Sequence, residues 1–222
     1  MAGFGFNLVA VPLLVLLISP KTTVPAVLMV WIPVGLALTW QARKQLERRR
    51  LPLLLIGGLL GLPVGGLLLR GLPEGVMKRS VGAVTLLLAG LLVLGLRWRL
   101  RREKPATFLT ATLAGVLGGA SAISGPPLVL FGLNQEWKPA AFRADLIAFF
   151  TVLSLCSLPV NAWLGLLTPE AGKLALAVVP GTALGYLMGG WLHRRTSPAA
   201  YRKVAFAAII LAGLLPLLLP LR

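Results

Sequence analysis

Long apolar stretches recur along the whole chain and constrain its fold more than any other feature. A membrane-spanning α-helix needs about 20 apolar residues, and six stretches approach that length: 22–41, 51–69, 81–96, 140–158, 174–192 and 204–221. Hydrophobic side chains make up 57% of the 222 residues and charged ones only 13%, against about 25% charged in soluble domains. The sequence therefore predicts an all-α polytopic membrane protein and excludes a water-soluble globule.

Two further apolar segments are interrupted. The first, residues 3–18, is short and opens on closely spaced glycines, whereas the second, residues 107–133, contains Gly118-Gly119 and the pair Pro126-Pro127. Proline lacks an N–H donor and clashes with the preceding helical turn, so the pair should stop one helix and start another. Both segments are therefore predicted to be broken or re-entrant helices.

An internal repeat relates the two ends of the chain. An offset of 124 residues aligns the glycines and basic residues of 57–79 with those of 181–203, and an offset of 115 places Pro12 on Pro127. Repeats of this kind indicate a fold built from copies of one unit. We expect a single integral-membrane domain made of two repeats, 1–104 and 105–222, each a broken segment followed by three transmembrane helices.

The basic residues favour one orientation of these repeats. The chain has 22 Lys and Arg against 6 Asp and Glu. The basic side chains cluster in the loops between the apolar stretches, so they indicate which loops face the cytoplasm rather than a nucleic-acid-binding surface. Cytoplasmic loops retain Lys and Arg. If both broken segments are re-entrant, sixteen of the 22 basic residues face the cytoplasm; if both cross, twelve do. The re-entrant topology gives three crossings per repeat, so the two repeats should be inverted, as in many secondary transporters.

The two interruptions are the candidate substrate site. A break frees backbone polar groups inside the membrane, where they must be satisfied by protein, water or ligand. A helix that begins after Pro127 could hold an oxyanion at its N-terminus, helped by nearby hydroxyl groups. The alternative is a glycine face for close helix packing. The predicted substrate-binding residues are Gly3, Gly5, Asn7, Pro12, Gly118, Gly119, Ser121, Ser124, Gly125, Pro126 and Pro127.

Arg143 and Asp145 are the candidate charged residues of the site. Asp145 is the one acidic residue within a predicted span, and ionisable groups inside a membrane are often functional. We expect Arg143 to attract a substrate anion and Asp145 to carry a coupling proton. The alternative is that both lie at the helix end and extend to the cytoplasmic interface.

Other motifs favour helix packing over chemistry. Glycines spaced by four residues form one stripe at Gly57, Gly61 and Gly65 and a matching stripe at Gly181, Gly185 and Gly189, which is typical of close helix contacts. The six tryptophans mostly lie near predicted span ends, as in an aromatic belt. With one cysteine and one histidine, no Walker loop and no hydrolase motif, the sequence predicts neither an enzyme, a metal site nor a cofactor.

The glycine and proline motifs resemble those of the sulfite exporter TauE/SafE family. They run from Gly3 to Pro12 in the first half and from Gly115 to Pro127 in the second, where Phe142-Arg-Ala-Asp145 follows. The resemblance implies an inner-membrane, multi-pass permease that exports small sulfur-containing anions such as sulfite or sulfonates. Family members usually have a further apolar segment before the first motif, so part of the first hairpin is expected to be missing.

We therefore expect a secondary transporter in which an anion binds between the two broken segments and the halves rock by alternating access. Its expected partners are a small anionic substrate and membrane lipid, without nucleic acid, and the sequence leaves a homo-oligomer open. The alternative is a non-transporting membrane assembly or a lipid-handling protein, which would have a dry, apolar interior at the breaks.

Overall fold

The computed structural model describes residues 5–94, 102–195 and 198–218, and every element in these ranges is a helix, which confirms the all-α prediction. The six predicted spans correspond to α2, α3, α4, α7, α8 and α9. The elements are α1 (Gly5–Leu17), α2 (Pro20–Ala42), the short 3-10 turn η1 (Arg43–Gln45), α3 (Leu51–Gly71), α4 (Glu74–Leu94), α5 (Glu103–Ser121), α6 (Gly125–Asn134), α7 (Pro139–Trp163), α8 (Pro169–Arg195) and α9 (Pro198–Leu218).

Three helices within the described ranges are long and apolar enough to cross a membrane. They are Pro20–Gln45, Leu51–Gly71 and Pro139–Trp163, whereas Asn7–Leu17 and Ala207–Leu218 are shorter apolar stretches. Helix α4 begins seven residues before the predicted span, at Glu74 rather than at residue 81. Its first two turns therefore carry Glu74, Lys78 and Arg79, and the predicted start at residue 81 was too late.

Proline sets the starts of several helices. Pro lies in the first turn of α2, α3, α6 and α7, where its missing N–H is not needed and its fixed φ suits a helix. At the start of α2, the side chain of Ser19 accepts a hydrogen bond from the N–H of Lys21 at 3.3 Å. Proline thus marks where the chain turns into the next helix.

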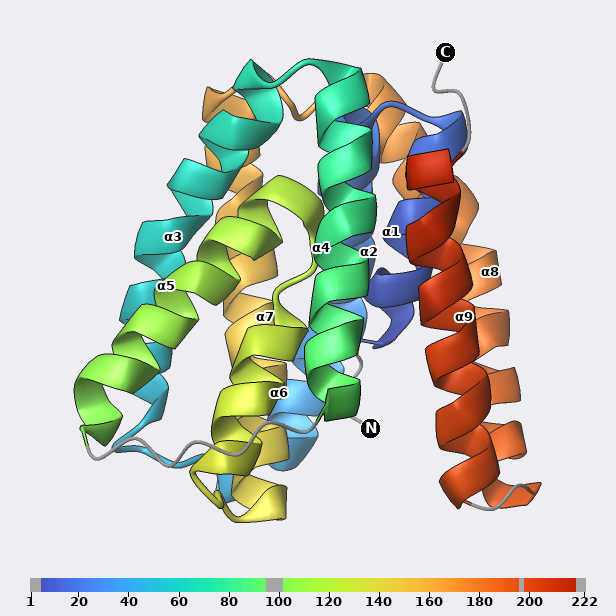
Figure 1. The fold of residues 1–222 in the computed structure, drawn as a ribbon. Helices are drawn as coiled ribbons and strands as arrows, with labels where there is room; N and C mark the ends of the chain where they lie inside the picture. Colours follow the sequence, from blue (N-terminus) through green and yellow to red (C-terminus); the bar gives the residue numbers. More distant parts are fainter. Residues whose placement is uncertain (1–4, 95–101, 196–197, 219–222) are drawn as a thin grey trace.

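The helices pack in pairs around the contact between α2 and α7. Helices α2 and α7 pack against each other, α3 packs on α5 and on α7, α8 packs on α2, and α9 packs on α4 and α1. In Figure 1, α3 and α5 lie at one side of the molecule and α8 and α9 at the other. The largest apolar core cluster contains residues of α1, α2 and α4 together with Ala122 and Ile123 from the α5–α6 connection.

The second interrupted segment is broken at residues 122–124. Helix α5 ends at Ser121, Ala122 takes the left-handed conformation with φ of 56°, and α6 begins at Gly125. The interruption was predicted, but α6 begins before the two prolines and not after Pro127. Figure 1 shows α6 returning toward the side of the molecule from which α5 starts, so the connection lies inside the fold.

The first segment differs from the prediction. Helix α1 continues through Pro12, and the chain leaves helical geometry only at residues 18–19, before α2. A proline within a helix removes one backbone hydrogen bond, and here the buried Pro12 is accommodated without a break. Residues 3–18 were predicted to be broken or re-entrant; the described part, 5–17, is an unbroken helix, so a break there is wrong and the re-entrant alternative stays a prediction.

Candidate functional site

A small cavity lies where α1 meets the α5–α6 connection. Its wall comes from α1, from the α5–α6 connection and from helices α2, α3 and α7. The lining residues are Asn7, Leu28, Trp31, Leu62, Gly118, Ala122, Ile123, Ser124, Gly125, Phe150, Leu153 and Ser154. The cavity therefore lies between the two segments that the sequence marked as interrupted.

Asn7 joins the two segments directly. Its side-chain Nδ2 donates a hydrogen bond of 2.8 Å to the carbonyl oxygen of Ala122. This oxygen belongs to the residue at which α5 ends, where a helix leaves carbonyl groups without intrahelical donors. The N–H of Ala122 in turn bonds to the carbonyl of Gly118 at 2.8 Å. Asn7 thus satisfies a backbone group that the break in the second half exposes.

The cavity is small and has an uncharged wall. Its volume is about 20 Å³ for the centres of water-sized molecules, and a site needs about 10–15 Å³ by this measure to hold one water. The side chains of Asn7, Trp31, Ser124 and Ser154 supply polar groups to the wall, and no lining residue carries a charge. In this conformation the cavity has room for a water-sized group.

The start of α6 offers few backbone donors to this cavity. Pro126 and Pro127 occupy its first turn, and proline has no N–H. The helix N-terminus that the sequence analysis expected to hold an oxyanion therefore lacks two of the donors that such a site uses. The side chains of the wall become the more important donors.

The structure brings four of the predicted binding residues to the cavity wall: Asn7, Gly118, Ser124 and Gly125. Gly118 lies close to the break, since a Cβ atom added to it would be 3.2 Å from the Cβ of Ser124. These residues come from the first half and from both sides of the second interruption.

The other predicted glycine, serine and proline residues do not line the cavity. A Cβ on Gly119 would meet the backbone of α3 at Gly66, and Ser121 donates to the carbonyl of Leu117 at 2.8 Å. Pro126 and Pro127 are buried at the start of α6, and Pro12 is buried within α1. Gly5 is the first residue of α1, and Gly3 lies outside the described residues.

Arg143 and Asp145 have different environments. Arg143 is exposed, whereas Asp145 is fully buried near the start of α7. The Asp145 Oδ1 accepts the backbone N–H of Glu47 at 2.9 Å, and its Oδ2 lies 3.3 Å from Nη1 of Arg50. Neither residue lines the cavity. Asp145 instead fixes the loop between α2 and α3 to α7.

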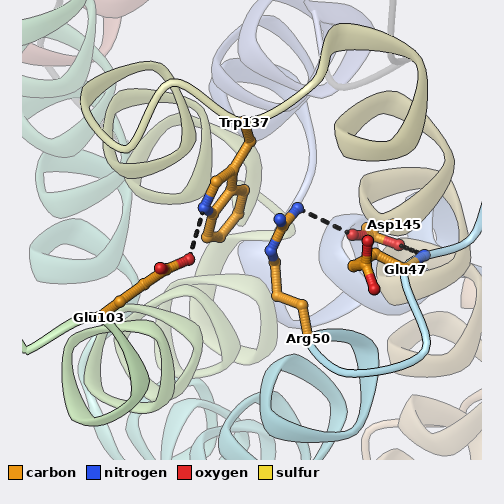
Figure 2. A network of polar contacts seen from close by, with 5 residues as sticks. All are labelled: Glu47, Arg50, Glu103, Trp137 and Asp145. Atoms are coloured by element: carbon orange, nitrogen blue, oxygen red, sulfur yellow. Dashed lines mark hydrogen bonds and ion pairs between the residues drawn. The ribbon is translucent and has the colours of Figure 1, made fainter.

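Arg50 is the centre of a larger network (Figure 2). Its guanidinium lies over the ring of Trp137, 3.7 Å from the ring centroid, a geometry in which a cation and an aromatic face attract each other. The Nε1 of Trp137 donates to Oε1 of Glu103 at 2.8 Å. The network therefore links the start of α3 to α5, to the α6–α7 turn and to α7.

Sequence reasoning missed most of the residues in this network and several in the cavity wall. Arg50 is the last of three consecutive arginines, and an aromatic belt was the expectation for most of the six tryptophans. In the structure Trp31 lies in the middle of α2 and Trp137 is only 8% exposed, so the belt explains neither. It fits Trp40 and Trp163, which are 69% and 72% exposed.

Comparisons with known proteins agree with the family resemblance. A family model described as Sulfite exporter TauE/SafE matches residues 1–215. A protein of Cupriavidus necator named "Probable sulfite/organosulfonate exporter TauE" is 35% identical over 106 residues, which are 48% of this chain and 41% of that protein. The chain thus matches less than half the length of this relative. No solved structure matches.

Proposed function

The chain belongs to the sulfite exporter TauE/SafE family, and from this premise we propose that it is a secondary transporter of small sulfur oxyanions, with a site between the two segments joined by Asn7. The family is one of exporters rather than enzymes. The named function of the Cupriavidus relative, export of sulfite and organosulfonates, supports the same substrate class for this chain. We place it as a multi-pass protein of the inner membrane, in contact with lipid.

The observation that carries the proposal is the position and chemistry of the cavity. Transporters of this general design bind substrate where discontinuous helices meet inside the bilayer, and the cavity lies between α1 and the α5–α6 connection. Its amide and hydroxyl groups suit the oxygens of a small anion. A packing or lipid-handling protein would need an apolar interior at this place, which these polar groups argue against.

The packing pattern supports an inverted repeat. Adding 124 residues to the bounds of α4 gives those of α9. If α2, α3 and α4 of the first half correspond to α7, α8 and α9 of the second, the contact of α2 with α8 is equivalent to the contact of α7 with α3. The central contacts, α2 with α7 and α4 with α9, pair one half with the other. In Figure 1, α2 and α7, α3 and α8, and α4 and α9 run in opposite directions. We therefore propose residues 1–104 and 105–222 as the two repeats.

Alternating access requires a contact that closes one side of the cavity and later opens. We propose the Arg50 network for this role on the cytoplasmic side, because Glu47 and Arg50 come from the first repeat and Trp137 and Asp145 from the second. Transport could be driven by the membrane potential, or by a proton that neutralises Asp145 and releases Arg50. Arg143 is not included, because its exposed side chain lies off the cavity wall.

The test is flux of sulfite and of methanesulfonate from loaded proteoliposomes. Ser124→Leu places a bulky apolar side chain in the cavity wall, so we expect at least a tenfold loss of flux. Arg143→Ala is the matched control, and its flux should stay within twofold of the wild type. The melting temperature of each variant separates loss of transport from loss of folding.

Two outcomes would contradict the proposal. Wild-type protein that moves neither anion would exclude the proposed substrate class. Wild-type flux in folded Ser124→Leu protein would instead remove the cavity as the site, while leaving transport itself intact.

A further inference from the structure

The indole N–H of Trp31 is a buried donor that no role described above uses. Trp31 lies midway along α2 and lines the cavity. Its Nε1 is buried and has no hydrogen-bond partner among the described residues. An indole nitrogen can only donate, and a buried donor that stays unpaired is unfavourable. A ligand with acceptor oxygens would therefore supply the hydrogen-bond partner that this indole N–H lacks.

The Nε1 of Trp31 is packed beside Gly35 and Thr151, between α2 and α7. Gly35 lies one turn further along α2, and a Cβ atom there would be 2.7 Å from Nε1 of Trp31 and 2.5 Å from Oγ1 of Thr151. Real Cβ atoms essentially never come so close to other heavy atoms. Glycine at position 35 thus lets the indole nitrogen and the threonine hydroxyl occupy the same small region between α2 and α7.

The neighbouring hydroxyls are already engaged. Thr151 Oγ1 donates to the carbonyl of Ile147 at 2.7 Å and lies 3.1 Å from Oγ1 of Thr39. With its own hydrogen used, Thr151 can only accept from Thr39. Of Trp31, Thr39 and Thr151, only Trp31 therefore has a side-chain donor without a partner among the described residues.

We propose that the Trp31 indole N–H binds an oxygen of the transported anion and that the site selects singly charged oxyanions. This inference rests on the proposed function. The wall contains no cation to balance a second charge, and a charge without a partner is costly to bury. Two of the backbone donors at the start of α6 are replaced by prolines, so neutral side-chain donors hold the anion. An alkanesulfonate has the required charge and oxygens.

Indole resonances of nitrogen-15-labelled protein in detergent micelles test the proposal without measuring transport. The chain has six tryptophans, and Trp31→Phe identifies the signal of Trp31 by its loss. Titration with methanesulfonate should shift that signal and leave the signal of Trp40 unchanged, because Trp40 is 69% exposed on the same helix. Sulfate, which carries two charges, should shift it far less at the same concentration.

Binding measured by calorimetry completes the test. Trp31→Phe keeps an aromatic ring beside Phe150 but replaces the indole with a smaller phenyl group that has no donor, so Kd for methanesulfonate should rise about tenfold, as for loss of one hydrogen bond. Trp40→Phe should bind like the wild type. Gly35→Ala should also weaken binding, because its Cβ meets the indole nitrogen.

The outcomes separate this inference from the function on which it rests. Wild-type protein that binds methanesulfonate without a shift of the Trp31 signal would overturn the role of Trp31 and leave the transporter proposal standing. Equal binding of sulfate and methanesulfonate would overturn the charge selectivity. Wild-type protein that neither binds nor transports any sulfur oxyanion would overturn both proposals.

Discussion

Arg50 differs from its neighbours in the same basic run through what it contacts. Arg49 is exposed, whereas Arg50 touches Asp145 and Trp137 and joins the two repeats. If this network closes the cytoplasmic side, Arg50→Gln should expose the cavity from that side. With Cys156→Ser as background and Ser124→Cys as reporter, we expect labelling by an impermeant maleimide in inside-out vesicles to become at least fivefold faster.

Arg49→Gln is the matched control for that experiment, since it removes the same charge one residue away. Its labelling rate should equal that of the background. A similar acceleration in both variants would indicate a general effect of loop charge, and no acceleration in Arg50→Gln would remove the network as the closing contact.

Asn7 carries a second prediction at this scale. Asn7→Ala leaves the carbonyl of Ala122 without its 2.8 Å donor, so unfolding should become easier by about 1–2 kcal/mol. Asn7→Asp should be worse, because it sets a carboxylate oxygen against that carbonyl oxygen. Thermal unfolding in detergent measures both. An Asp variant as stable as the wild type would show that this contact does not hold the two segments together.

From the sequence, only those site residues could be identified that interrupt or adjoin an interruption of an apolar run. Ser124 and Gly125 lie where glycine and proline interrupt an apolar run, and Asn7 is a polar residue just after closely spaced glycines. Trp31 and Ser154 lie inside uninterrupted helices, where nothing local marks them. They reach the cavity because α2 packs against α7, and such tertiary contacts are not readable from spacing.

At the scale of elements, the contact between α3 and α5 depends on glycine. A Cβ on Gly61 or Gly65 would press into the backbone of α5, at 2.8 Å from the nitrogens of Val116 and Ala120 respectively. Small residues allow this approach in membrane helices, and the packing predicted for the first stripe is confirmed. In the second stripe, a Cβ atom added at Gly181 would meet no other helix within 4 Å, so the close contact predicted there is wrong. The side-chain surroundings of Gly185 and Gly189 lie outside the described residues.

Alanine substitutions in α3 test this contact. Gly65→Ala should destabilise the protein by about 1–3 kcal/mol, as overpacking does, because the α5 backbone would have to move. Gly71→Ala is the control on the same helix, since a Cβ there meets nothing within 4 Å. Thermal unfolding should separate the two variants, and equal stability would mean that α3 and α5 adjust without strain.

At the scale of the whole molecule, the sequence predicted the helices better than their ends. Apolar length located α2, α3 and α7 to within a few residues. It placed the start of α4 too late, because the apolar criterion stops at charged residues and Lys78, only 6% exposed in the structure, is inside the fold. It also allowed a break within residues 3–18, because a local rule cannot tell a proline that ends a helix from one, such as Pro12, that a surrounding core accommodates.

Topology is the property on which the proposed mechanism depends most. Re-entrant segments place the α2–α3 loop and the α6–α7 turn on the cytoplasmic side and the α3–α4 and α7–α8 connections on the other, in accord with the excess of basic residues inside. We therefore expect single cysteines at Arg49 and Lys138 to react with an impermeant maleimide only in inside-out vesicles. Cysteines at Gly71 and Leu167 should react only in right-side-out vesicles.

The two cytoplasmic positions decide between the topologies, because they flank different repeats. If α5 and α6 together crossed the membrane, residues 49 and 138 would lie on opposite sides and react in opposite vesicles. Such a result would also place Arg50 and Asp145 across the bilayer from each other, which their 3.3 Å contact forbids. Both the Arg50 network and the inverted repeat therefore require that residues 49 and 138 are labelled from the cytoplasmic side.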